Sequence, residues 1–186
     1  DVVPRVNLFL GGAPFNLESR PVGAILAPLG DVGNYLGTTA ESGDFNGDGL
    51  PDLVFSAPGE SLVHLVLGGT ELDLGIDLSV PYGPNENDPA PYPCRDGRIS
   101  VGEINGDDFD DFVINCDEHN SLHVYLGAST LPTKMAWTYQ LESSYYELTD
   151  TLLVDLNGDG YDELISGRIY SYNDVSTAGV LVFAGS

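Results

Sequence analysis

Short apolar runs separated by polar, glycine-rich segments recur along the chain of 186 residues. One kind of run reads LVFSAP, FVINC and ELISG, and each copy is bounded by Gly, Pro or polar residues. A second kind ends in small residues, at Val6–Ala13, Leu62–Gly69, Leu122–Ala128 and Val180–Ser186. Runs of this length, rich in Val, Ile, Leu and Phe, predict β-strands. Their recurrence predicts an all-β repeat protein.

An acidic loop precedes each run of the first kind. DFNGDGLPD at Asp44–Asp52 recurs as EINGDDFDD at Glu103–Asp111 and as DLNGDGYDE at Asp155–Glu163. Side-chain oxygens at positions 1, 3, 5 and 9, with a main-chain carbonyl at position 7, suit a hard cation and Ca²⁺ best. The loops therefore predict up to three Ca²⁺ ions. Their candidate ligands are Asp44, Asn46, Asp48, Leu50, Asp52, Glu103, Asn105, Asp107, Phe109, Asp111, Asp155, Asn157, Asp159, Tyr161 and Glu163.

The loop is not of the EF-hand type. That type needs a bidentate Glu at position 12 and flanking helices, whereas position 12 is Phe55, Ile114 and Ser166 in the three copies. Gly47 and Gly49 supply the backbone freedom that a tight loop needs, and Asn-Gly and Asp-Gly pairs are typical of hairpin turns. We therefore expect each loop to join two strands of a hairpin.

The three loops differ in how well their residues suit Ca²⁺. Glu103 replaces Asp at position 1 of the second loop, and Asp108 stands where glycine would relax a left-handed backbone. We expect this loop to bind Ca²⁺ more weakly than the others. Glu163, at position 9 of the third loop, is longer than Asp and is expected to coordinate differently or through water. The alternative for all three loops is a solvated turn without an ion.

These residues resemble the FG-GAP repeat of integrin α-subunit β-propellers and related proteins. The first copy is closest, since YLG at Tyr35–Gly37 stands for Phe-Gly and SAPGE at Ser56–Glu60 for Gly-Ala-Pro. The other copies keep the loop and lose both flanking signatures, although the resemblance covers nearly the whole chain. It implies four antiparallel strands per blade, with Ca²⁺ between strands 1 and 2. It also implies ligand binding on the opposite face, formed by the 2–3 and 4–1 loops.

The resemblance divides the chain into about three repeats within one propeller region, 1–186. We expect strands 3 and 4 of a blade in 1–34, complete blades in 35–81 and 96–142, strands 1 to 3 in 148–186, and a Pro-rich loop at 81–98. Propellers need about four to eight blades. The chain is therefore part of a longer propeller, or completed by copies of itself or another chain, or left with protected edge strands.

The Pro-rich segment, with five of the twelve prolines, is expected to be a surface loop because proline cannot join a sheet interior. The resemblance places it on the ligand face together with Ser171–Thr177. The tyrosines of this region either contact a sugar or protein or pack onto their own blade: Tyr82, Tyr92, Tyr170 and Tyr172.

The formal net charge of −23 argues against nucleic acid or an anionic membrane as a partner, since both require basic patches. Lys134 is the single lysine, and no apolar stretch approaches a membrane span. Asp1 begins the sequence without a signal-like run, so we expect a processed protein or an excised segment. The excess of acidic residues either keeps the protein soluble by charge repulsion or is an adaptation to a saline extracellular environment.

Cys94 and Cys116 are the only cysteines, and both lie in the second repeat. They form either one disulfide, as oxidising compartments allow, or two isolated thiols. A disulfide and Ca²⁺ loops of low affinity both suit a secreted or cell-surface protein.

Catalytic signatures are missing from the sequence. His64 and His123 hold the same repeat position and are expected to be structural, and His119 lies in a polar turn. There is no nucleophile elbow, zinc-binding helix or phosphate loop. We therefore expect an extracellular calcium-binding β-propeller module for adhesion or recognition, and no enzyme. The alternatives are a self-associating structural subunit, which contacts copies of itself through end strands, and a lectin-like propeller. Protein or glycan partners are expected on the 4–1 and 2–3 loop face.

Overall fold

A computed structural model describes residues 5–9, 23–26, 36–71, 73–81, 94, 97–131, 135–141, 145–173 and 175–185, without the side chains of Leu26 and Glu118. The regular elements of these residues are β-strands and two three-residue 3₁₀ turns, so the all-β prediction is confirmed. Within the same residues, no helix has the length and apolar character needed to cross a membrane.

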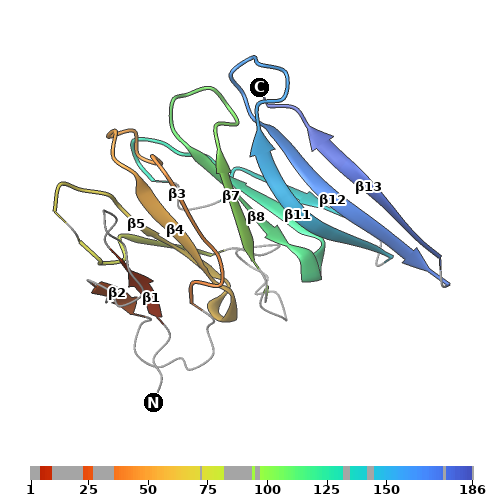
Figure 1. Cartoon of the computed structure of the whole chain (residues 1–186), viewed down its shortest axis with the longest axis horizontal. Helices are drawn as coiled ribbons and strands as arrows, with labels where there is room; N and C mark the ends of the chain where they lie inside the picture. Colours follow the sequence, from red (N-terminus) through yellow and green to blue (C-terminus); the bar gives the residue numbers. More distant parts are fainter. Residues whose placement is uncertain are drawn as a thin grey trace.

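The strands form four antiparallel sheets of two, four, four and three strands (Figure 1). The N-terminal sheet contains β1 (Arg5–Leu8) and β2 (Gly23–Leu26). The first sheet contains β3 (Ala40–Gly43), β4 (Asp52–Ala57), β5 (Leu62–Val66) and β6 (Leu78–Pro81). The second contains β7 (Arg98–Gly102), β8 (Asp111–Cys116), β9 (Ser121–Tyr125) and β10 (Trp137–Gln140). The third contains β11 (Tyr146–Val154), β12 (Glu163–Tyr172) and β13 (Val175–Phe183).

Each larger sheet is a meander in which consecutive strands pair. The acidic loops join β3 to β4, β7 to β8 and β11 to β12, so the predicted hairpins are confirmed. The 3₁₀ turns Pro58–Glu60 and Asp117–His119 join the next pairs of strands in the first and second sheets. The four-stranded antiparallel sheets agree with the architecture that the FG-GAP resemblance implies. The described strands form an open row in Figure 1 and not a closed ring.

The hydrophobic core lies between neighbouring sheets. Strand β8 demonstrates this, because side chains alternate across a strand. Phe112 and Ile114 pack in a cluster with residues of the first sheet, whereas Val113 packs in a cluster with residues of the third sheet. All three side chains are fully buried. The apolar run FVINC is therefore continuous because the strand has a neighbour on both faces.

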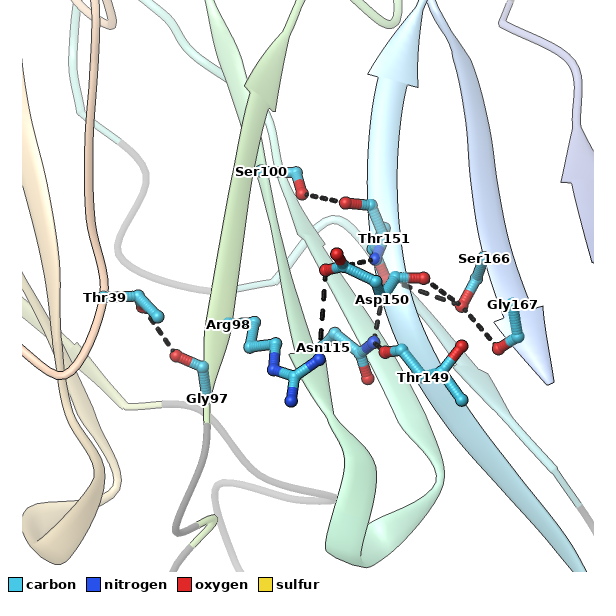
Figure 2. A network of polar contacts seen from close by, with 10 residues as sticks. All are labelled: Thr39, Gly97, Arg98, Ser100, Asn115, Thr149, Asp150, Thr151, Ser166 and Gly167. Carbon is cyan, nitrogen blue, oxygen red and sulfur yellow. Dashed lines mark hydrogen bonds and ion pairs between the residues drawn. The ribbon is translucent and has the colours of Figure 1, made fainter. Parts of the chain in front are cut away.

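Polar contacts also join neighbouring sheets (Figure 2). Ser100 Oγ on β7 donates to the carbonyl oxygen of Thr151 on β11 at 2.7 Å. Asn115 Nδ2 donates to Thr151 Oγ1 at 2.9 Å and to the carbonyl oxygen of Thr149. Between the first and second sheets, Thr39 Oγ1 donates to the carbonyl oxygen of Gly97 at 2.8 Å. These bonds hold β11 against β7 and β8, and the residue before β3 against the residue before β7.

Cys94 and Cys116 form a disulfide, and their Cα atoms lie 5.6 Å apart. Both are buried in the cluster between the first and second sheets. The bond ties the segment ahead of β7 to the end of β8. Of the two alternatives left open by the sequence, the structure therefore selects the disulfide.

Candidate metal loops and their contacts

The first acidic loop is closed by the carboxylate at its first position. Asp44 Oδ1 accepts hydrogen bonds from the backbone N–H groups of Gly47 at 2.7 Å and Asp48 at 3.1 Å, and Oδ2 accepts one from Gly49 at 2.8 Å. Gly47 and Gly49 have φ angles of +72° and +82°, a region that glycine occupies without steric cost. The two glycines therefore allow the backbone to turn around the side chain of Asp44.

The third loop repeats this arrangement. Asp155 accepts hydrogen bonds from Gly158, Asp159 and Gly160 at 2.7, 3.2 and 3.0 Å. These N–H groups, that of Gly160 first, lower the pKa of Asp155 and favour its anionic form. The first and third loops therefore hold the carboxylate of position 1 in the same way.

The second loop is built less regularly. Glu103 Oε1 accepts hydrogen bonds from Asn105 at 3.2 Å, Gly106 at 2.6 Å and Asp107 at 3.4 Å. Asp108 has a φ angle of 66°, which confirms the left-handed backbone expected there. One oxygen of a longer side chain thus makes the contacts that two oxygens make in the first and third loops.

Positions 3 and 5 complete the outer part of each loop. In the first, Asn46 Oδ1 accepts from Asp48 N at 2.9 Å, and Asp48 Oδ1 accepts from the N–H of Leu50 at 2.8 Å. The second and third loops contain the same pair of bonds. Amide and carboxylate oxygens therefore gather within one exposed turn.

Position 9 is buried in all three loops. The oxygens of Asp52 accept from Phe45 N at 3.0 Å and Gly68 N at 2.8 Å, and the residue is 2% exposed. Asp111 is bound in the same way by Ile104 and Gly127, each at 2.8 Å. Burial raises the pKa of both carboxyl groups, that of Asp111 to about 6. These two acids hold the loop onto the end of the third strand.

Glu163, at the same position of the third loop, makes different hydrogen bonds. Its Oε2 accepts from Leu156 N at 2.9 Å, whereas Oε1 accepts from the Asn157 side chain at 3.0 Å. The extra methylene thus directs one oxygen into the loop itself.

The loop residues fit Ca²⁺ by their chemistry. Among the described residues, no three His, Cys, Asp or Glu side chains are grouped closely enough to hold a metal by themselves. A complete set in the first loop would therefore combine the carboxylates of Asp44 and Asp48 with the Asn46 amide, the Leu50 carbonyl and water. Each oxygen of Asp52 retains a second lone pair and can join this set.

Position 8 links one loop to the next, a role that the sequence analysis missed. Asp110 Oδ2 accepts from the N–H of Asp44 at 2.7 Å, and the N–H of Asp110 donates to the carbonyl oxygen of Asp44 at 3.0 Å. Asp162 makes the same two bonds to Glu103, at 2.9 and 2.6 Å. Pro51, at position 8 of the first loop, has neither a carboxylate nor an N–H. The identical Asp in the second and third copies was the available signal.

Positions 4 and 7 pack in the same direction. A Cβ built on Gly47 would collide with the ring of Phe109, and one built on Gly106 would collide with the ring of Tyr161. Nothing lies within 4 Å of a Cβ at Gly158, the equivalent position of the third loop. The position-7 side chain of each following loop therefore covers the glycine of the preceding one.

The histidines and tyrosines lie outside the loops. His64 Nδ1 contacts Ser79 Oγ at 2.8 Å and His123 Nδ1 contacts Thr138 Oγ1 at 3.2 Å, at equivalent places between the third and fourth strands. Tyr170 and Tyr172 contact rings of their own sheet, chiefly Tyr146 at 5.0 Å and Tyr145 at 4.9 Å between ring centroids. Tyr82 and Tyr92 are outside the described residues.

Comparison with known proteins identifies the first of the repeats. The family model of the FG-GAP repeat matches residues 36–71, which contain β3, the first acidic loop, β4 and β5. A search of the curated proteins found no match. The matched segment is the copy that keeps both flanking signatures. The match covers a smaller part of the chain than the resemblance described from the sequence, which extended over nearly all of it. Residues 36–71 are therefore an FG-GAP repeat, which confirms the family recognised from the sequence.

Proposed function

We propose that this chain is a calcium-binding module of an extracellular β-propeller, in which Ca²⁺ stiffens the hairpin loops through which successive sheets contact one another, and that the module serves adhesion or recognition. The FG-GAP repeat supports a propeller of the integrin α-subunit type. Such repeats are generally non-enzymatic, and we propose no catalytic activity. The FG-GAP repeat together with the disulfide supports an extracellular or surface location.

One observation carries the proposal. Asp44 is both the first candidate ligand of its loop and the residue whose backbone binds Asp110 of the next sheet. An ion bound by the Asp44 side chain would therefore restrain the backbone atoms on which the second sheet is anchored. Since binding to the folded state alone adds its free energy to folding, Ca²⁺ would stabilise the contact between sheets as well as the hairpin.

The charge of the loops supports a cation. Each loop carries three carboxylates at positions 1, 5 and 9, in a chain of net charge −23. Like charges at such short separations destabilise the folded state, and a bound cation reverses the sign of that interaction. The ion would supply charge neutralisation and a rigid set of oxygen contacts.

The test compares melting temperatures in millimolar Ca²⁺ and in EDTA, with calorimetric titration of the apo-protein. We expect Ca²⁺ to raise the melting temperature markedly, and we expect each chain to bind up to three Ca²⁺ ions. Asp48→Asn and Asp159→Asn should reduce the calcium-dependent part of the shift because each removes one charge from a loop. Glu41→Ala, which removes an exposed acid of β3 outside the loops, is the matched control. A melting curve unchanged by EDTA would refute the proposal.

The hydrogen bonds of the loops predict which of them contributes most to the stabilisation by Ca²⁺. Asp44→Ala or Asp155→Ala should reduce the calcium-dependent shift more than Glu103→Ala, because Glu103 holds its loop through one oxygen only. Each of these variants also loses hydrogen bonds within the loop. The difference between Ca²⁺ and EDTA, and not the absolute melting temperature, is therefore the measurement.

A glycan ligand is the second candidate, and exposed aromatic rings favour it. Tyr145 and Tyr172 are 48% and 47% exposed and lie at the end of the third sheet away from its acidic loop. A glycan array with the wild type, followed by Tyr172→Ala, tests this candidate. An array without binding, or binding that survives the substitution, favours a protein partner instead.

A further inference from the structure

Strands β12 and β13 of the third sheet are longer than their counterparts in the other two sheets (Figure 1). They have ten and nine residues, whereas β4 and β8 have six and β5 and β9 have five. The first and second sheets have a 3₁₀ turn after the second strand. In the third sheet, β12 continues to Tyr172, which pairs with Val175 of β13.

The extension of β12 turns its large side chains toward the second sheet. β12 pairs with β13 without a register shift, so alternate residues from Leu164 to Tyr172 lie on one face. Leu164 packs in the cluster between the second and third sheets. Arg168, Tyr170 and Tyr172 therefore lie on the face whose neighbour is the second sheet, beyond the end of that cluster.

Four tyrosine rings are in contact on this part of the sheet, and we call them the tyrosine patch: Tyr145, Tyr146, Tyr170 and Tyr172. Tyr145 lies 4.9 Å from Tyr172 and 6.3 Å from Tyr170 between ring centroids, both edge to face, and Tyr146 lies 5.0 Å from Tyr170. An edge-to-face contact leaves both faces of one of its rings uncovered. Tyr145 and Tyr172 are indeed about half exposed, at 48% and 47%.

Arg168 lies beside the tyrosine patch. Its guanidinium carbon is 5.3 Å from the centre of the Tyr146 ring, and its Nε would be 3.4 Å from a Cβ at position 179, which is Gly179. Counted from their acidic loops, the equivalent residues of the first and second sheets are the fully buried Ala57 and Cys116. The tyrosine ring and the glycine therefore hold a cation where the other sheets have a small buried residue.

The guanidinium of Arg168 is available to an acceptor from outside the chain. Within the described residues it forms no ion pair or side-chain hydrogen bond, and its ring contact is with Tyr146. Arg98, by comparison, is 4.0 Å from a carboxylate oxygen of Asp150. A guanidinium presents its N–H donors as a planar fork, which binds a carboxylate through two parallel hydrogen bonds. The patch thus combines exposed rings with a donor group that suits a carboxylate.

We propose that the tyrosine patch and Arg168 bind an oligosaccharide that carries one carboxylate, of the uronic acid kind. This inference rests on the second candidate function, a glycan ligand, and names its chemical class. The C–H faces of the sugar rings stack on Tyr145 and Tyr172, because aromatic rings bury apolar surface while their hydroxyl groups stay in water. The carboxylate accepts two hydrogen bonds from Arg168.

The spacing of these residues requires a ligand with more than one sugar ring. Arg168 and Tyr172 are four residues apart on one strand, which corresponds to about 13 Å. A single sugar ring cannot reach both side chains. The acidic sugar therefore lies over Arg168, and a neighbouring sugar of the same chain stacks on the exposed tyrosines.

The charge of the protein limits the ligand to few acidic groups. Glu163, the nearest end of the acidic loop along β12, is five residues from Arg168, or about 16 Å. This exceeds the distance of about 8 Å over which exposed charges interact at physiological ionic strength. One carboxylate at Arg168 is therefore attracted locally, whereas a polyanion would also meet the net charge of −23.

The test compares two saccharides on the wild-type protein by calorimetric titration. One is a trisaccharide that ends in glucuronic acid, and the other ends in glucose, so that they differ only by a carboxylate in place of a CH₂OH group. The acidic trisaccharide should bind at least about tenfold more tightly, because charge-assisted hydrogen bonds are lost with the neutral one. The measurement is made in Ca²⁺ and in EDTA, at a temperature at which the protein remains folded in both.

Substitutions then assign the preference to its residue. Arg168→Gln should bind the two trisaccharides with equal affinity, and Arg168→Lys should keep only part of the preference because it lacks the planar fork. Tyr172→Ala should weaken both trisaccharides by a similar factor. Arg98→Gln is the matched control, since this arginine has its own carboxylate partner, and it should keep the full preference. The ratio of the two affinities does not depend on the stability of each variant.

Four outcomes would overturn the inference. Equal binding of the two trisaccharides would do so while leaving the glycan candidate in place, whereas binding of neither would remove both. A preference that disappears in EDTA would assign the carboxylate to Ca²⁺ and not to Arg168. A short peptide with one aspartate that binds as tightly as the acidic trisaccharide, with the same dependence on Arg168, would indicate a protein ligand. The calcium-dependent shift in melting temperature is measured separately, so the calcium proposal stands or falls by itself.

Discussion

Asp110 and Asp44 form a reciprocal contact between two acidic loops. The carboxylate of Asp110 accepts the N–H of Asp44 at 2.7 Å, and the backbone of Asp110 donates to the Asp44 carbonyl at 3.0 Å. Asp162 repeats the contact on Glu103. The candidate metal loops are therefore joined to one another in a series along the row of sheets.

Removing this carboxylate should loosen the first sheet from the second. Asp110→Ala is expected to lower the free energy of unfolding by about 2 kcal/mol, because a charge-assisted hydrogen bond is lost and an N–H is left without its acceptor. Asp110→Asn should cost less, since its amide oxygen can still accept. Urea unfolding in EDTA measures both variants. Glu41→Ala should stay within about 0.5 kcal/mol of the wild type, and an Asp110→Ala variant that matches this control would contradict the role assigned to the contact.

Equivalent glycines should respond differently to the same substitution. Gly47 and Gly158 have φ angles of +72° and +79°, so alanine has a similar backbone cost of about 1 kcal/mol at each. Only at Gly47 would the added methyl collide with the ring of Phe109. Gly47→Ala should therefore destabilise the protein by at least about 1 kcal/mol more than Gly158→Ala. The comparison is made by thermal unfolding at low protein concentration, and equal losses would mean that packing between loops adds nothing.

The disulfide should contribute measurably to stability. Cys94 and Cys116 are 22 positions apart in the sequence. Closing a loop of this size lowers the conformational entropy of the unfolded chain, which stabilises the folded state by about 3 kcal/mol. Reduction of the wild type should lower the urea midpoint accordingly. Cys94→Ala/Cys116→Ala should unfold at the same midpoint with and without reductant. A wild-type midpoint that does not change on reduction would argue against this contribution.

His123 should make stability depend on pH. Its ring is fully buried, and this burial, with a smaller effect from His119, lowers the pKa from 6.5 to about 4. Between these values the unfolded chain binds a proton that the folded chain does not, so stability falls as the pH falls. The loss attributable to this residue is about 3 kcal/mol across the window.

His123→Gln isolates this contribution from that of the carboxylates. From pH 7 to pH 4.5 the unfolding free energy of the wild type should fall more than that of the variant, because only the wild type carries the imidazole that becomes protonated on unfolding. Urea unfolding at several pH values measures it. Parallel pH profiles for the two proteins would exclude His123 as the titrating group.

The sequence by itself determined the repeating elements. Apolar runs bounded by Gly, Pro and acidic loops predicted strands, and Asn-Gly and Asp-Gly pairs predicted the hairpins that β3–β4, β7–β8 and β11–β12 form. These features could be recognised because a turn depends on the φ angles of adjacent residues and an FG-GAP repeat is a local pattern. The left-handed backbone of Asp108 was predictable for the same reason.

Only the tertiary structure decided how the repeats meet. The role of Asp110 and Asp162 was not predicted, because each binds a loop 66 or 59 residues away along the chain. Phe45 and Leu156 hold the same position in the sequence pattern, yet Phe45 is buried against the second sheet whereas Leu156 is exposed among the residues that the structure describes. Burial is a property of neighbours in space, and a local pattern cannot specify which side chains will have them.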